Sequence, residues 1–231
     1  SHAFMKITGA VKNLYGLVCG MRKARGHVVY PNEAKFAQML VDIHRLTKPR
    51  LHVMDAVIAM EGKGPSSGSP RDMGLIIVSA DPVAIDTVFA RLVNLNPGLV
   101  LTNTHGMIAG IGTCNESEIA LKLIDNGGIT DISFDEMFAR FGKEDFDVCR
   151  KKDKVNILGL LSRITGRFSK RPYIDADMCV KCGMCVSHCP VEGHAVTFKN
   201  GKDNIPVYDY RKCIRCFCCQ EICPQHAIKV K

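Results

Sequence analysis

The sequence predicts an α/β protein of two domains, in which a domain built on a mostly parallel sheet precedes a small α+β domain rich in cysteine. Strand-like and helix-like segments alternate over residues 1–149, which favours the parallel sheet. One cysteine pattern occurs twice within residues 173–231. The composition turns basic over residues 150–172, so we expect this stretch to connect the two domains.

The first elements expected are two helices and a strand. Residues 8–18 carry apolar side chains at helical spacing. Residues 33–46 show the same periodicity more clearly, with Asn32 placed to cap the first turn and Pro49 just beyond the end. Residues 51–58 are dense in β-branched and apolar side chains, which predicts a strand.

The next stretch, residues 60–74, has the composition of a loop. It holds four glycines, two prolines and three serines in fifteen residues, which disfavours both a helix and a central strand. A buried strand is expected over residues 74–79. Asp81 can then cap a helix that has Pro82 in its first turn and runs to about Leu92.

Two more elements complete the first domain. A short helix is expected over residues 102–109, and alternating apolar and polar residues over 118–124 predict another strand. Strand, helix and strand following one another at these intervals are typical of a parallel sheet.

The pattern C-x-x-C-x-x-C-x-x-x-C-P carries the strongest functional signal. Its cysteines are Cys179, Cys182, Cys185 and Cys189 in the first run, and Cys213, Cys216, Cys219 and Cys223 in the second. Because the first three thiols of each run stand three residues apart, one tight loop can place them on three corners of an iron-sulfide cube. Zinc ribbons space their ligands as two separated pairs, so the pattern favours iron-sulfur clusters over zinc or disulfides.

The segment from Cys179 to Pro224 resembles the bacterial two-cluster ferredoxin family, whose function is low-potential transfer of single electrons. In that family the cysteine before proline ligates the cluster of the other run. The resemblance therefore implies two 4Fe-4S clusters, one held by Cys179, Cys182, Cys185 and Cys223 and the other by Cys213, Cys216, Cys219 and Cys189. The runs repeat at an offset of 34 residues, and two such halves would make a small α+β ferredoxin-like body. Its core is too small to stand without metal, so we expect folding and cluster insertion to be coupled.

These expectations favour an iron-sulfur electron-transfer protein that relays single electrons to or from a partner protein. The alternative is an oxidoreductase, a reductase or activase, in which the first domain binds a substrate or cofactor and the clusters deliver electrons to it. A third interpretation is structural, with clusters that only hold a docking module together.

Cysteine usage and hydropathy bear on the compartment. The remaining cysteines, Cys19, Cys114, Cys149 and Cys218, are scattered and are interpreted as reduced thiols. We therefore expect a reducing cytoplasm. Apolar runs such as residues 74–80 are far shorter than the roughly 20 residues of a membrane helix, so no membrane span is expected.

The formal net charge of +8 concentrates its cations between residues 151 and 231. A basic face there could steer an acidic redox partner, or the cations could merely offset the negative charge of the clusters. Within residues 150–172, one helical face carries Leu158, Leu161, Ile164 and Phe168. This amphipathic pattern fits either a membrane surface or, as we favour, packing on the protein itself. Tryptophan is absent and aromatic residues make up 6 %, which argues against nucleic-acid binding.

Residues 1 to about 142 resemble a second family, the uncharacterised proteins called domain of unknown function 362, which often carry a ferredoxin module. The likeness rests on short motifs in matching order: Ser1-His2, residues 8–13, residues 54–56, residues 60–65 with 68–71, and residues 79–84. Members usually extend well upstream of the position of Ser1, so the resemblance implies the C-terminal part of a longer protein. It implies no established reaction.

The glycine-rich stretch of residues 60–74 is a candidate ligand site. Backbone amides and a few charges there could hold an anionic small molecule. The candidate binding residues are Lys12, Asn13, Asp55, Glu61, Gly62, Gly64 and Arg71. The alternative is a solvent-exposed connection of turn residues, because no phosphate-binding signature is present.

Overall fold

The computed structural model describes residues 1–2, 5–19, 26, 29–30, 32–64, 67–125, 127–150, 171–199 and 201–230. The chain divides into two compact units. The first comprises Ser1–Val18 and Asn32–Lys151, and the second comprises Cys19–Pro31 and Lys152–Lys231. Of the predicted basic connector, residues 150–172, residues 151–170 lie outside the described residues.

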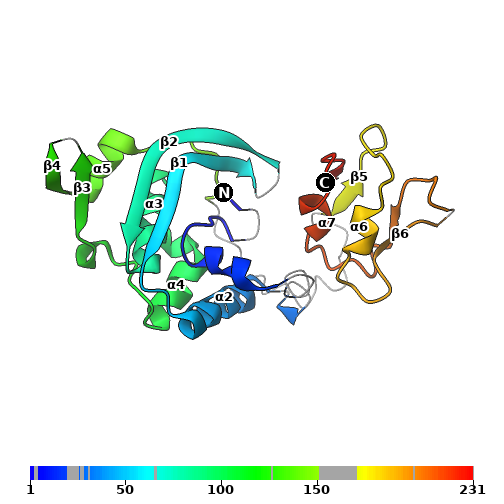
Figure 1. Cartoon of the computed structure of the whole chain (residues 1–231), viewed down its shortest axis with the longest axis horizontal. Coiled ribbons are helices and arrows are strands. Elements are labelled where there is room, and N and C mark those ends of the chain that lie inside the picture. The colour runs from blue at the N-terminus through cyan, green and yellow to red at the C-terminus, as the bar shows by residue number, and fades with distance from the viewer. Residues whose placement is uncertain are drawn as a thin grey trace. The chain divides into compact units, whose positions relative to one another are not determined.

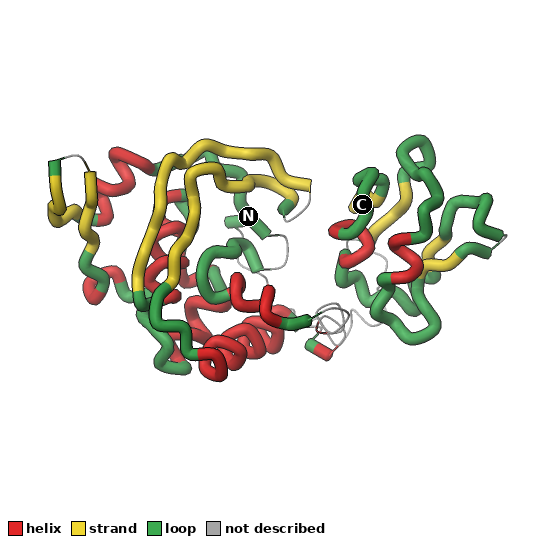
Figure 2. The backbone as a smooth tube through the Cα atoms, viewed as in Figure 1, coloured by secondary structure: helices red, strands yellow, loops and turns green. Residues whose placement is uncertain are grey.

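A long hairpin dominates the first unit (Figures 1 and 2). Strand β1 (His52–Lys63) pairs antiparallel with β2 (Ser67–Ser79), in a register that runs from His52 opposite Ser79 to Lys63 opposite Ser67. The register shifts once, between Ala56 and Ile58. The prediction of a loop over residues 60–74 is therefore wrong, because most of this stretch belongs to the two strands.

Turn-forming residues are accommodated here because both strands of the hairpin are edge strands of a two-stranded sheet. Pro70 lies opposite Met60 near the tip, and an edge strand tolerates proline where no partner needs its missing N–H group. Gly68 allows the strands to approach closely, since a Cβ atom there would meet the Glu61 carbonyl oxygen at 2.4 Å. Gly74 adopts a φ of 66°, which glycine reaches without strain. Composition alone does not distinguish a hairpin that uses glycine and proline at these positions from a loop.

The predicted mostly parallel sheet is also wrong. In the described parts of the chain, every sheet is a two-stranded antiparallel pair: β1 with β2, β3 with β4, β5 with β8, and β6 with β7. Strand β3 (Leu121–Asp125) turns directly into β4 (Gly128–Ile132), with Leu121 opposite Ile132. A short turn can join only antiparallel strands, whereas a parallel pair needs a crossover of a dozen or more residues.

The helices follow the sequence more closely. Helix α2 (Glu33–Thr47) starts where predicted, and the Asn32 side chain accepts hydrogen bonds from two amides of its first turn. Helix α3 (Pro82–Leu92) is capped by Asp81 through the Ala84 amide, which confirms the predicted cap.

The shorter helical elements were predicted less well. The expected helix over residues 8–18 is a 3-10 helix, η1 (Lys12–Leu17). Helix α4 (Leu101–Ile108) replaces the expectation of 102–109, and two further 3-10 turns are η2 (Pro97–Leu99) and η3 (Glu116–Glu118). Helix α5 (Phe134–Phe141) was not predicted; its N-terminus carries a capping box.

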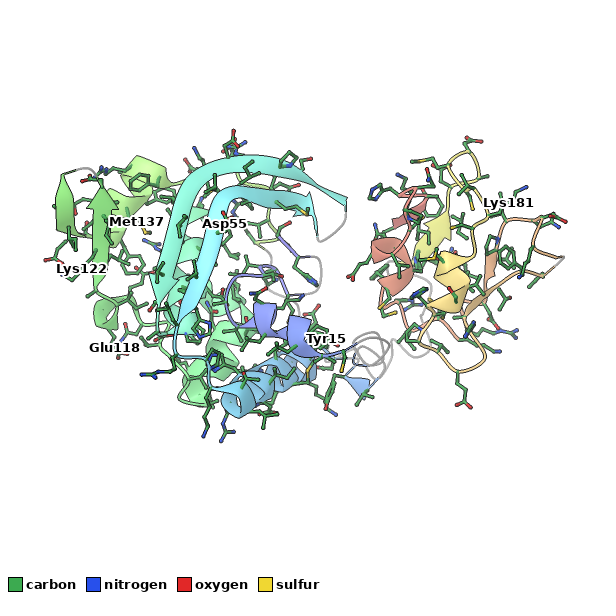
Figure 3. All side chains as sticks on the ribbon, viewed as in Figure 1. Tyr15, Asp55, Glu118, Lys122, Met137 and Lys181 are labelled. Carbon is green, nitrogen blue, oxygen red and sulfur yellow. The ribbon has the colours of Figure 1, made fainter. Side chains whose placement is uncertain are left out.

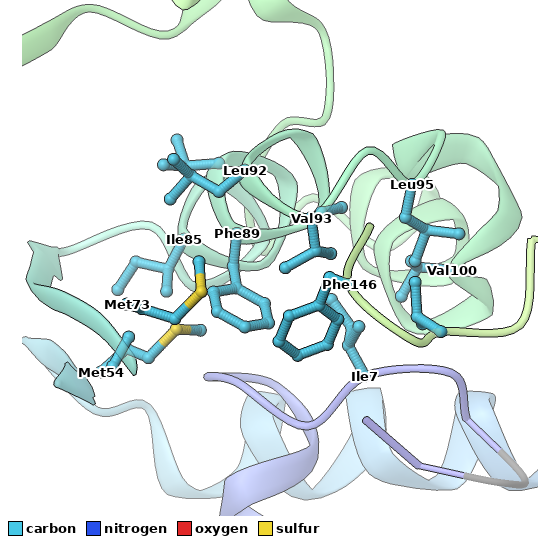
Figure 4. Packing of buried hydrophobic residues seen from close by; sticks show 14 of the residues in the cluster. Ile7, Met54, Met73, Ile85, Phe89, Leu92, Val93, Leu95, Val100 and Phe146 are labelled. Carbon is cyan, nitrogen blue, oxygen red and sulfur yellow. The ribbon is translucent and has the colours of Figure 1, made fainter. Parts of the chain in front are cut away.

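The main core of the first unit lies between α3 and the inner face of the hairpin (Figure 4). Met54 from β1 and Met73 from β2 point toward Phe89 of α3, and Phe89 meets Phe146 edge to face at 6.2 Å between ring centroids. The N-terminal segment contributes Ile7, which is 1 % exposed. The alternation of buried and exposed side chains along β1 gives the hairpin one core face and one solvent face.

Asp86 ties the N-terminal segment to this core. Its carboxylate is 1 % exposed and accepts hydrogen bonds from the amides of Ala10 at 2.7 Å and Val11 at 3.2 Å. Burial raises the pKa of Asp86 to about 6, although the two backbone donors oppose the shift. The chain entering η1 is therefore held by a side chain 75 residues away.

A pair of buried histidines joins α2 to β1. His44 and His52 stack at 5.1 Å between ring centroids, and their Nε2 atoms lie 3.1 Å apart. Desolvation by burial lowers the pKa of both imidazoles. Each folded-state pKa lies below its unfolded value, so the pair stabilises the fold above about pH 6.5 and loses that contribution as the pH falls.

The histidine pair predicts an acid-sensitive first unit. The double variant His44→Gln, His52→Gln should lose less stability than the wild type when the pH is lowered from about 7.5 to about 5.5, because it lacks these two buried imidazoles. Urea unfolding at both pH values measures the difference. His105→Gln replaces a half-buried histidine outside the pair and is the matched control. Equal slopes for all three proteins would contradict this account.

The second unit is made of short elements around two loops (Figure 1). Strand β5 (Pro172–Ile174) pairs antiparallel with β8 (Ile228–Val230). Strand β6 (Val196–Thr197) pairs antiparallel with β7 (Val207–Tyr208).

Each loop leads into a one-turn helix, α6 (Met184–Ser187) in the first half and α7 (Cys218–Glu221) in the second. This is the small α+β arrangement that the repeat predicted. Within the described residues, no helix of either unit is long and apolar enough to cross a membrane.

Candidate metal centre

The eight cysteines of the repeated pattern line two hollows in the second unit. The first hollow, an empty space of about 350 Å³ that includes its open mouth, is lined by Cys179, Cys182, Cys185 and Cys223. The second, of about 310 Å³, is lined by Cys213, Cys216, Cys219 and Cys189. We call these the first and second thiol sets. In each set three thiols come from one run and the fourth comes from the other.

Left-handed backbone turns position the three consecutive thiols of each run. Lys181 and Arg215 stand at equivalent places in the two runs and have φ angles of 58° and 59°. Gly183 and Phe217, also equivalent, are left-handed and directly precede α6 and α7. Such turns curl a short loop around a centre, so successive cysteines can face one hollow. Lys181 is labelled in Figure 3.

The walls of both hollows are largely apolar. Ile174, Ala227 and Ile228 line the first hollow. Val196 lines the second, together with Pro190 of the C-P motif. An apolar wall limits water around an anionic iron-sulfur centre, and this is one of the factors that set its reduction potential.

Backbone amides donate to the two crossing cysteines. The Ala195 amide lies 3.3 Å from the Cys189 sulfur, and the Ala227 amide lies 3.3 Å from the Cys223 sulfur. Thiolate ligands gain from such donors because the donors stabilise negative charge on sulfur. Both halves supply this backbone donor in the same way.

The second thiol set has an additional donor. The Tyr208 hydroxyl lies 3.1 Å from the Cys219 sulfur and donates to it. Sequence reasoning missed Tyr208, although the repeat contained a signal. At the offset of 34 residues Tyr208 corresponds to Ile174, so one half of an otherwise similar repeat carries a hydroxyl and the other does not.

The metal-free thiols are protonated near neutral pH where they are most buried. Burial raises the pKa of Cys185 to about 11 and that of Cys219 to about 12. Because metals bind thiolates, loading either set must displace protons.

Four thiols in each hollow, apolar walls and donors aimed at sulfur together fit a 4Fe-4S cluster better than isolated metal ions. Within the described ranges, no three His, Cys, Asp or Glu side chains converge closely enough to hold a single ion.

The other polar side chains nearby have different neighbours. Cys218 does not line either hollow, and its sulfur points toward the Cys216 carbonyl oxygen at 4.0 Å. His188 places Nδ1 2.9 Å from the Ser187 hydroxyl. No histidine is found among the residues that line the two hollows in the described part of the chain.

The glycine-rich candidate site is engaged with the protein itself. Arg71 bonds Asp145 at 2.5 Å and lies 3.9 Å from Glu61. The Glu61 carboxylate accepts the Asp147 amide at 3.1 Å, and the Gly62 amide donates to the Asp147 carbonyl at 2.7 Å. These contacts attach the hairpin to residues 145–147, so the structure joins three of the predicted residues in a fold-stabilising cluster.

The remaining predicted residues lie on other elements. Lys12 and Asn13 begin η1. Asp55, labelled in Figure 3, is on the solvent face of β1, where its side chain accepts the Val57 amide at 3.0 Å. Gly64 lies just beyond the end of β1. A Cβ atom added to Gly64 would lie 2.3 Å from the carbonyl oxygen of Ser1, so the two segments are close. A ligand site that combines them stays a prediction.

Two family models match parts of this chain. Residues 1–91 match the domain of unknown function DUF362, and residues 171–224 match a 4Fe-4S dicluster domain. The first match lies at the N-terminal end of this chain and stops short of the predicted limit near residue 142. The second covers all eight cysteines of the repeated pattern.

Curated relatives resemble segments of the chain. A thylakoid-associated protein of Synechocystis is 39 % identical over 103 residues, which are 44 % of this chain and 32 % of that protein. A ferredoxin of Pyrobaculum islandicum is 37 % identical over 59 residues, or 26 % of this chain and 51 % of the ferredoxin.

A third relative is the delta subunit of the NADH-dependent phenylglyoxylate dehydrogenase of Aromatoleum evansii. It is 38 % identical over 60 residues, which are 25 % of this chain and 56 % of that protein. The chain thus matches between about a third and just over a half of the length of these relatives. No solved structure matches the chain.

Proposed function

We propose that this chain is an iron-sulfur electron-transfer protein that holds two 4Fe-4S clusters and relays single electrons to or from a partner protein. The observation that carries the proposal is the pairing of two hollows with four thiols each, completed by Cys223 in the first and Cys189 in the second. The match of residues 171–224 to a 4Fe-4S dicluster domain supports it, as does the likeness to a ferredoxin.

Different residues of the chain bind the metal, stabilise charge on sulfur and limit water around such a centre. When bound, each cluster supplies a reversible one-electron couple. Eight thiolates hold the metal, and the amides of Ala195 and Ala227 stabilise charge on the two crossing sulfurs. The apolar walls restrict water. The short elements leave Cys182 exposed and bury Cys185 and Cys219. An exposed ligand suits electron exchange with a partner.

The proposal also includes the charge of the partner protein. The described residues of the second unit carry eight lysines and arginines against six carboxylates, so their own positive excess is small. Most of the predicted basic charge falls on residues 151–170. We expect an acidic partner to be attracted by the positive charge of that stretch.

From cysteine usage we still expect a cytoplasmic location. One relative, however, is described as thylakoid-associated.

Metal analysis under anaerobic conditions tests the proposal. The loaded full chain should contain about eight iron and eight acid-labile sulfide atoms, and dithionite should reduce it reversibly, with an electron paramagnetic resonance (EPR) signal from reduced clusters. Stoichiometric zinc without sulfide would overturn the proposal. If the clusters could not be reduced at a physiological potential, their role would be structural only.

Removing the metal should unfold the second unit selectively. Its core cluster contains Cys185 and Cys219 beside Val196 and Ile228, so the ligands form part of the packing. Cluster removal by oxidation with a chelator is expected to abolish amide protection over residues 171–230 while residues 52–92 stay protected. Hydrogen exchange followed by mass spectrometry measures both regions. Retained protection in the second unit would show that its fold does not need the metal.

A further inference from the structure

We infer that Tyr208 makes the two centres unequal, so that the second thiol set is reduced at a higher potential than the first. This inference rests on the proposed function and adds an order to the electron transfer. It begins from the 3.1 Å hydrogen bond between the Tyr208 hydroxyl and the Cys219 sulfur.

The tyrosine ring is held in place by the residues around it. Tyr208 belongs to β7 and lies opposite Val196 of β6. Its ring stacks on Tyr210 at 5.6 Å between centroids and 16° between planes. Tyr210 is fixed in turn, since its hydroxyl donates to the Pro172 carbonyl at 2.9 Å and the Arg171 guanidinium lies 4.8 Å over its ring. The Tyr208 hydroxyl therefore keeps its direction without further ordering.

The first thiol set lacks this donor. The backbone donors of the two halves are matched at 3.3 Å, from Ala195 to Cys189 and from Ala227 to Cys223. Ile174 occupies the position of Tyr208 in the repeat and lines the first hollow with an apolar side chain. At this position the halves differ by one hydroxyl donor, which the second set has and the first does not. They also differ beside Cys216, where the second run has Cys218 and Glu221 and the first has Met184 and Ser187. The Tyr208→Phe variant removes the hydroxyl and leaves those two differences in place.

A hydroxyl donor at a ligand sulfur favours the reduced state. Reduction adds negative charge to a cluster and its thiolates, and the O–H dipole stabilises that charge more than it stabilises the oxidised form. In the one-electron reduced chain, the equilibrium moves the electron from the first set to the second, which oxidises one centre and reduces the other. The electron is supplied by the redox partner, or by dithionite in the test.

An EPR-monitored redox titration of the loaded full chain tests this order. The wild type should show two distinct midpoint potentials. Tyr208→Phe keeps the ring and removes the donor, so the higher potential should fall while the lower one stays. We expect a shift equivalent to about a tenfold change in the equilibrium between the centres, about 59 mV for one electron. Ser187→Ala, which removes a hydroxyl of the same unit that contacts His188 and the Met184 carbonyl, is the control and should change neither potential.

Several results separate this inference from the proposed function. Equal potentials in the wild type, or two unchanged potentials in Tyr208→Phe, would overturn the role of Tyr208. If the same protein still contained eight irons per chain, the proposed function would stand. Fewer irons in the wild type would count against the proposed function itself. Should Tyr208→Phe fail to load, 3,5-difluorotyrosine at position 208 offers a stronger donor of the same shape. It should raise the higher potential, and an unchanged value would again overturn the inference.

Discussion

Replacing Cys223 with alanine is expected to remove one whole cluster, the one whose other three ligands come from the first run. Iron content should fall from about eight to about four atoms per chain, because a cube without one of its four thiolates is lost from a small domain that depends on it. The reason for the crossed effect is geometric, since Cys223 lines the same hollow as Cys179 and Cys182. Iron and sulfide analysis of the purified variant measures the loss.

Double variants test which thiols share a cluster. Cys179→Ala combined with Cys223→Ala should lose no more iron than either single variant, because both residues belong to the first set. Cys213→Ala combined with Cys223→Ala should lose nearly all of it. Cys218→Ala is the matched control and should keep full iron, since Cys218 does not line either hollow. The opposite pattern in the two double variants would assign each cluster to a single run.

Asp86→Ala is expected to destabilise the first unit by about 2–4 kcal/mol. The substitution leaves the amides of Ala10 and Val11 without their acceptor, and both residues are at least 95 % buried. A buried donor left without a partner costs roughly 1–3 kcal/mol, and two such donors add. Urea unfolding at pH 7, followed by a probe in the first unit, measures the change.

An exposed aspartate provides the control for this variant. Asp135 on α5 has a side chain that is 98 % exposed and forms a long ion pair of 3.8 Å with Arg91, so Asp135→Ala should change the free energy of unfolding by less than about 0.5 kcal/mol. A loss for Asp86→Ala that is no larger than this control would show that the N-terminal segment is not held by the carboxylate.

The Asp86 carboxyl makes the free energy of unfolding depend on pH in the direction opposite to that of the histidine pair. Its folded pKa of about 6 lies above the unfolded value, so between about pH 4 and 6 the folded chain binds more protons than the unfolded chain. The contribution of this group to stability therefore falls as the pH rises through that window. The histidine pair acts in the opposite direction, which is why its test compares variants instead of the wild type alone.

Helix boundaries and the cysteine pattern could be derived from local sequence because they depend on local chemistry. Asn32 and Asp81 cap their helices through amides two or three residues away. The three-residue spacing of the thiols is likewise a property of one loop. Such features need no knowledge of distant segments, so periodicity and capping rules were sufficient.

The antiparallel hairpin could not be derived in this way. Glycines and prolines in residues 60–74 have the same composition whether they form a loop or the tip of a ribbon, and the difference lies in the partner strand. The interpretation as a loop removed that partner, and strand and helix alternation then suggested a parallel sheet. Pairing is a non-local property, and here it overrode local propensity.

The kind of metal centre follows from the eight cysteines alone, because their type and spacing limit which centre they can hold. The arrangement of the groups around that centre becomes known only from the folded chain. It placed the Tyr208 hydroxyl on one sulfur and left Ile174 at the equivalent position, and it turned the predicted ligand residues Glu61 and Arg71 toward the protein's own backbone and side chains. The physical reason is that a hydrogen bond depends on where two distant segments meet, and a linear pattern does not specify that position.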